Sequence, residues 1–165
     1  MIRLSIVVAY LILLVVAQAP STTNWRGLSP LQSTRMDVER TLGAPEGKVD
    51  NQQMTYYFHD VVVFISFSGN PKCQQKLPYT SWDVPSDTVT GINVRLRHPL
   101  KISETGFDLT KFEKIKGDYD LSDHYVYLNR EDGFAVEVDR NYVSGYLYSP
   151  GSKQQKLRCE RSKQQ

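Results

Sequence analysis

The stretch Val61-Val62-Val63-Phe64-Ile65-Ser66-Phe67, VVVFISF, consists almost entirely of β-branched and aromatic residues, which predicts a β-strand. Residues 54–58, MTYYF, predict a second strand, and the intervening pair His59-Asp60 predicts a turn. The two strands should therefore form an antiparallel hairpin. Residues 88–96 predict a third strand, because apolar side chains alternate there with Asn93 and Arg95.

A short helix should precede this meander and end at Gly43. Thr34 is a good N-cap, Asp37 falls in the positive first turn, and Val38 shares one face with Leu42. Gly43 could belong to a ligand-binding loop or could end the helix. Glycines that cradle phosphate precede a helix N-terminus, whereas Gly43 follows the last turn, so we predict a helix stop.

The same order of elements recurs in the second half of the chain. Thr110 and Glu113 have the spacing of a capping box, which predicts a second helix ending at Gly117. Strands are predicted at 124–128, 134–138 and 142–148, and the last contains Val-Ser-Gly-Tyr where the first half has Val-Thr-Gly-Ile. We therefore predict an α+β fold of two helix-plus-antiparallel-meander units (αβββ twice), with both helices on one face of the sheet and the other face free.

The predicted organisation starts with a signal peptide at residues 1–19, since Arg3 precedes an apolar run that ends in Ala17-Gln18-Ala19. Cleavage after Ala19 would leave a proline first, so cleavage after Ala17 and retention as an anchor stay open. The first αβββ unit spans 20–100 and includes a long Pro-containing loop at 71–87. The second unit spans 101–149, and a polar basic tail follows at 150–165. We expect a periplasmic or extracellular protein.

Cys73 and Cys159 are the only cysteines in the sequence. In an exported protein they predict a disulfide, and two unpaired thiols are the main alternative. A zinc or nucleophilic site is disfavoured, because neither cysteine has CxxC spacing or a neighbouring histidine.

The first unit resembles the SmpA/OmlA (BamE-like) domain family over about residues 33–70. The resemblance is carried by Thr34, Asp37-Val38, Leu42-Gly43-x-Pro45, Tyr56-Tyr57 and Phe67-Ser68-Gly69. The doubled arrangement is similar to the β-lactamase-inhibitor-protein fold, in which tandem units form a concave sheet that grips another protein. The resemblance implies a small exported bacterial envelope protein that acts by binding and carries over no catalytic residues. Two departures are the lack of a lipid-anchor cysteine at the cleavage region and the loop around Trp82.

Catalytic and cofactor motifs are lacking, so we predict no enzyme, no cofactor and no metal site. No GxSxG, Walker or GxGxxG motif occurs, and the His-Asp pairs at His59 and His124 are typical of turns. Arg95, Arg97, His98 and Lys101 form a basic cluster that could meet an anionic group or could simply be outward charges on a strand. Removing Arg3 lowers the formal charge from +2 to +1, and this near-neutral charge and the export signal argue against nucleic-acid binding.

Tyr79 and Trp82 are the candidate partner contacts in the loop, because exposed aromatic side chains offer rigid contact area. Trp82 could instead cover the open end of the core. Tyr127, Tyr146 and Tyr148 are the candidates on the free sheet face. We expect a protein-binding or envelope-assembly module with a protein partner. The alternatives are an inhibitor of a secreted enzyme, a small ligand carrier or a hydrolase. The basic tail could touch a membrane surface transiently.

Overall fold

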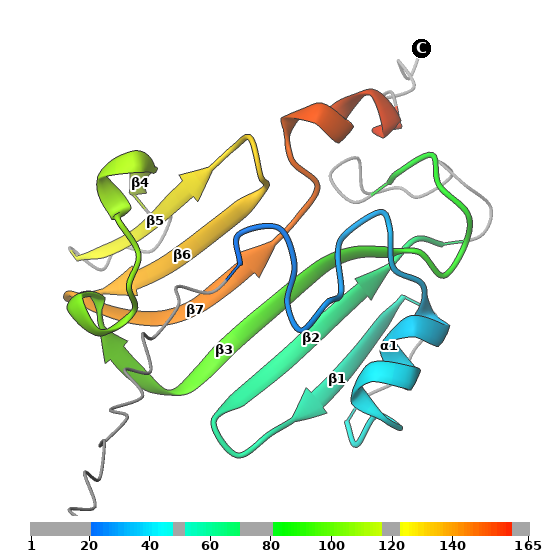
Figure 1. Ribbon diagram of the computed structural model, residues 1–165, viewed down its shortest axis with the longest axis horizontal. Helices are drawn as coiled ribbons and strands as arrows, with labels where there is room; N and C mark the ends of the chain where they lie inside the picture. Colours follow the sequence, from blue (N-terminus) through cyan, green and yellow to red (C-terminus); the bar gives the residue numbers. More distant parts are fainter. Residues whose placement is uncertain (1–20, 48–51, 70–80, 117–122, 160–165) are drawn as a thin grey trace, which may run out of the picture.

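The computed structural model describes residues 21–47, 52–69, 81–116 and 123–159. These residues form one seven-stranded antiparallel sheet with the order β1-β2-β3-β7-β6-β5-β4 (Figure 1). The strands are β1 (Gln53–Tyr57), β2 (Val61–Phe67), β3 (Val89–Lys101), β4 (Glu113–Lys116), β5 (His124–Asn129), β6 (Phe134–Asp139) and β7 (Tyr142–Tyr148). The six strands predicted from the sequence correspond to β1, β2, β3, β5, β6 and β7.

The two meanders meet at β3 and β7, which pair with each other. Ile92 lies opposite Tyr148 and Val94 opposite Tyr146, so the last strands of the two halves form the centre of a continuous sheet. β1 and β4 are the outermost strands of this sheet.

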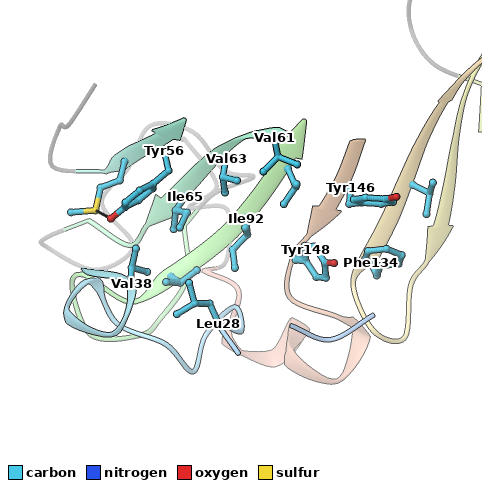
Figure 2. Close-up of a cluster of buried hydrophobic side chains, with 14 of the residues drawn as sticks. Leu28, Val38, Tyr56, Val61, Val63, Ile65, Ile92, Phe134, Tyr146 and Tyr148 are labelled. Atoms are coloured by element: carbon cyan, nitrogen blue, oxygen red, sulfur yellow. Dashed lines mark hydrogen bonds between the residues drawn. The ribbon is translucent and has the colours of Figure 1, made fainter. Parts of the chain in front are cut away.

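One face of the sheet carries the hydrophobic core. In β2 the side chains of Val61, Val63, Ile65 and Phe67 are buried, and the residues between them are half-buried. Figure 2 shows Leu28 and Val38 facing Ile65 and Ile92, with Phe134, Tyr146 and Tyr148 grouped at the other end of the core. Burial of each large apolar side chain contributes roughly 1.5–3 kcal/mol, so this layer supplies most of the stability.

Three segments cover the core face (Figure 1): α1 (Arg35–Leu42), the entry segment 21–34, and the segment after β3. The last of these contains two 3-10 turns, η1 (Ile102–Glu104) and η2 (Leu109–Lys111). The segments place buried Leu28 and Val38, and partly buried Phe107 and Phe112, against the sheet.

The predicted helix at Thr34 is confirmed, including its cap. The Thr34 hydroxyl accepts from the Asp37 amide at 3.3 Å, and the Asp37 carboxylate accepts from the Thr34 amide at 2.8 Å. These hydrogen bonds, the one from the backbone amide above all, lower the pKa of Asp37. Gly43 follows the last turn with φ +83°, and its amide donates to the carbonyl of Glu39 at 2.9 Å. The prediction of a helix stop is therefore also confirmed.

The prediction of two αβββ units is wrong, because α1 is the one α-helix among the described residues. Asp108, rather than Thr110, caps the second segment, and only the single 3-10 turn of η2 follows. The chain then continues as β4, which pairs with β5, and Glu113 forms an ion pair with Arg130 of the following loop. A helix this short forms few hydrogen bonds for the cost of nucleation, whereas the edge of β5 supplies a ladder.

The region predicted as a polar tail is partly structured. Residues after the buried Pro150 form η3 (Ser152–Leu157), whose end pairs with the segment that contains Trp82. The amide of Asp83 donates to Leu157 O at 2.7 Å, and the amide of Cys159 donates to Ser81 O at 3.1 Å. Cys159 is disulfide-bonded. Cys73 lies outside the described residues, so its pairing with Cys159 stays a prediction.

Residues 1–19, the predicted signal peptide, also lie outside the described part of the chain. Within that part, no helix has the length and apolar character needed to cross a membrane.

Candidate functional site: the open face of the sheet

The face of the sheet opposite the core, called here the open face, carries a mixed row of apolar and polar side chains. In β2, Val62, Phe64 and Ser66 are half-buried, and in β3, Asn93 is half-buried and Arg95 is exposed. Within the described residues, α1 and the entry segment lie over the other face (Figure 1). The open face is therefore where these strands meet solvent or a partner.

A hollow of about 410 Å³ lies on this face, across β1, β2, β3 and β7. It is lined by Gln53, Phe64, Ser66, Gly91, Asn93, Arg95 and Leu147. The strand register explains this set. Asn93 lies between Phe64 and Leu147 on the adjacent strands, and Ser66 lies between Gln53 and Gly91. Because Gly91 has no side chain, the row of Gln53, Ser66 and Gly91 is lower than the row of Phe64, Asn93 and Leu147, and it forms the floor of the hollow.

Two charged groups of the open face, Arg95 and Glu137, lie on either side of β7. Arg95 is paired in register with Gly145, and Gly145 is paired with Glu137 of β6. Two strand spacings separate the backbones of the cation and the anion by roughly 10 Å. The Arg95 guanidinium lies over the Phe64 ring, 5.3 Å from its centroid, so the cation is held beside the hollow.

The two glycines matched in the sequence have different roles in the structure. A β carbon on Gly145 would lie 2.7 Å from the carbonyl oxygen of Val94, so the close approach of β3 and β7 requires glycine there. A β carbon on Gly91 would have only an ordinary contact, at 3.7 Å from Tyr148 O. Gly91 thus keeps the hollow open, whereas Gly145 permits the strand pairing.

The tyrosines predicted for the free sheet face lie on the core face instead. Tyr146 and Tyr148 are 8% and 2% exposed and pack against Phe134, and burial raises the pKa of both hydroxyls. Tyr127 is half-buried against the same core. The register decides the face, because a shift by one residue would expose the whole set.

Of the two loop candidates, Trp82 is 7% exposed and forms a β-bridge with Arg158, so it is buried beside the segment that follows η3 rather than exposed for a partner. Tyr79 lies outside the described residues. The structure therefore gives Trp82 no surface for contact with a partner.

The histidines and most of the basic cluster lie away from the hollow. His59 and His98 are exposed and His124 is half-buried in β5, and the described residues hold no metal-binding group of histidine, cysteine and acidic side chains. Arg97 donates to the carbonyl of Phe58 at 3.0 Å, and Arg95 lines the hollow. Sequence reasoning placed Arg95 in a cluster with its chain neighbours but missed Ser66 and Leu147, which the register brings to the same hollow as Arg95.

A second hollow, of about 390 Å³, lies near the β6–β7 turn and is lined by Pro99, Asp139, Arg140, Tyr142 and Ser144. Asp139 and Arg140 lie 3.5 Å apart and neutralise each other. This hollow therefore offers less unpaired charge to a ligand than the one on the open face.

The chain matches no protein-family model, no curated protein and no solved structure. The resemblance to the SmpA/OmlA family stays a prediction carried by the residues of α1, β1 and β2.

Proposed function

We propose that this chain is an exported, non-enzymatic binding module of the bacterial cell envelope, and that its open face docks a protein partner. The observation that carries the proposal is the one-sided cover of the sheet. α1, the entry segment and the segment after β3 pack on the core face, while the other face presents a hollow with aromatic, aliphatic and hydrogen-bonding side chains.

The chemistry of the hollow favours binding over catalysis. Its described lining residues include the guanidinium of Arg95, the amide of Asn93 and the hydroxyl of Ser66 between apolar walls, and none of the described lining residues is a histidine, a cysteine or an acid. Arginine and aromatic side chains dominate the energetics of protein interfaces, and a cation stacked on a ring is a frequent anchor. The open face therefore has the composition of a docking surface.

Site-specific photo-crosslinking in exporting cells tests the proposal. A benzophenone amino acid replaces Asn93 in the hollow, and a control chain carries it at Met36, which is 70% exposed on α1. We expect a discrete protein adduct from position 93 and none from position 36. The protein identified in the adduct, once purified, should bind the mature chain, and it should bind the Phe64→Ala variant more weakly.

Adducts of equal yield from both positions, or none from position 93, would contradict docking on the open face. Sequencing of the exported chain tests the other half of the proposal, since residues 1–19 or 1–17 should be missing from its N-terminus.

A further inference from the structure

We propose that the hollow of the open face receives an extended segment of the partner that contains an acidic residue, whose carboxylate binds Arg95 and Asn93. A neighbouring apolar side chain of that segment packs between Phe64 and Leu147. The inference rests on the proposed function and specifies the chemistry of its partner.

Arg95 is the first reason for assigning an acidic ligand. Arg35, Arg130 and Arg140 each have a carboxylate within 3.5 Å. Arg95 has none within the described part of the chain, and its guanidinium lies over the Phe64 ring. A guanidinium that stacks on a ring keeps its N–H groups at the edge, where they can grip a carboxylate with two parallel hydrogen bonds.

Asn93 adds a donor in the row next to Arg95, and Ser66 adds one in the row beyond Asn93. The side chains of Asn93 and Ser66 form no hydrogen bond with any described residue, although both are half-buried and line the hollow. A half-buried amide and hydroxyl gain from a partner, because their exposure to water is already reduced. A carboxylate accepts from several donors at once, so it satisfies the guanidinium and the amide together.

The apolar walls of the hollow, Phe64 and Leu147, indicate that an apolar residue should lie next to the acidic residue in the partner segment. Phe64 and Leu147 lie on the two strands adjacent to Asn93 in the same register row, and Gly91 leaves the floor next to them open. An apolar side chain placed over this row contacts both walls. The hollow of about 410 Å³ has room for one such side chain and a carboxylate.

Glu137 determines over which strands the partner segment should be acidic. It lies on the open face on the far side of Gly145 and has no ion-pair partner among the described residues. An acidic group placed there would be repelled, whereas a basic group would be attracted. The partner segment should therefore be acidic over β3 and neutral or basic over β6.

Selection from a random octapeptide library, displayed on phage and panned against the purified mature chain, tests the inference. We expect enrichment of sequences with an aspartate or glutamate next to an apolar residue. Fluorescence anisotropy then compares the best peptide with its analogue in which asparagine or glutamine replaces the acid. The amide analogue should bind about tenfold more weakly, and higher salt should reduce the difference.

Arg95→Gln should lose the same factor for the acidic peptide and show no preference between the two peptides. Arg40→Gln is the control for loss of an arginine away from the hollow, because Arg40 is exposed on α1, where it pairs with Asp37. Thermal unfolding should show both variants folded, since both positions are exposed.

Enriched peptides without acidic residues, equal affinity of the two peptides, or equal loss from Arg40→Gln would overturn the inference. If the crosslink from position 93 persists in any of these cases, docking on the open face stands and only the acidic specificity fails. Loss of the crosslink together with the absence of peptide binding would overturn both.

Discussion

Replacing Gly133 with alanine should destabilise the contact that holds the C-terminal segment on the β5–β6 hairpin. Gly133 has φ +72°, and a β carbon there would lie 2.0 Å from the carbonyl oxygen of Ser149 and 2.7 Å from the amide nitrogen of Gly151. Both atoms belong to the backbone, so no side-chain rotation relieves the clash. The loop and the segment after β7 would have to move apart.

The size of the effect follows from two contributions. The left-handed backbone conformation costs a residue with a β carbon about 1–2 kcal/mol. Separation also weakens the two hydrogen bonds that the carbonyl of Gly133 accepts from the amide and the hydroxyl of Ser149, both at 2.8 Å. Each is worth about 0.5–1.5 kcal/mol, so Gly133→Ala should lower the free energy of unfolding by roughly 2–5 kcal/mol. That is a large part of the 5–15 kcal/mol typical of a domain, on the order of one third.

Urea unfolding followed by tryptophan fluorescence measures this loss, because Trp82 is buried beside the C-terminal segment. Gly27→Ala is the matched control. Gly27 has φ +82°, and a β carbon added to it would have no atom within 4 Å, so this variant should lose only the backbone contribution of about 1–2 kcal/mol. A loss from Gly133→Ala no greater than the loss from Gly27→Ala would refute the assignment of the clash.

Three further predictions concern the core, the helix cap and the disulfide. Phe134→Ala should lower the free energy of unfolding by about 3–5 kcal/mol, because this ring is fully buried. Phe64→Ala should lower it clearly less, because Phe64 is half-buried, and should weaken partner binding. Equal urea midpoints of the two variants would contradict this. Because the pKa of Asp37 is lowered in the folded protein, the stabilisation of the fold by its ionised carboxylate is present above the ordinary carboxyl pKa. This stabilisation is lost as the pH falls through and below about 4. Melting temperatures of the wild type and Asp37→Asn should therefore converge in acid, and a constant difference would show that the charge has no role. Non-reducing peptide mapping should link Cys73 to Cys159, and reduction should lower stability by about 2–4 kcal/mol; a free thiol in the exported protein would contradict the bond.

The elements that the sequence predicted correctly depend on local interactions. Thr34, Asp37 and Gly43 define α1 through a capping box and a positive φ angle, which involve residues close together in the chain. The boundaries of β2 and β7 follow from runs of β-branched and aromatic residues between turns. In each case the chemistry of neighbouring residues was sufficient to choose the local conformation.

Segment 109–116 shows where local reasoning fails. Its capping-box spacing and apolar residues suit a short helix, yet the edge of β5 is available and the segment pairs with it as β4. The energy of that ladder depends on a strand that follows in the sequence and on its position in the sheet. Helix propensity alone could not anticipate it.

By itself, the sequence determined the antiparallel meanders and the capped helix that precedes the first of them. The N-terminal export signal stays a prediction. Only the tertiary structure decided which face of each strand is covered. The pairing of β3 with β7 directs Tyr146 and Tyr148 into the core and places Leu147 next to Asn93, in the same row as Phe64, on the open face. A strand's alternation separates its two faces, but the choice of the buried face is made by the segments that pack against the sheet.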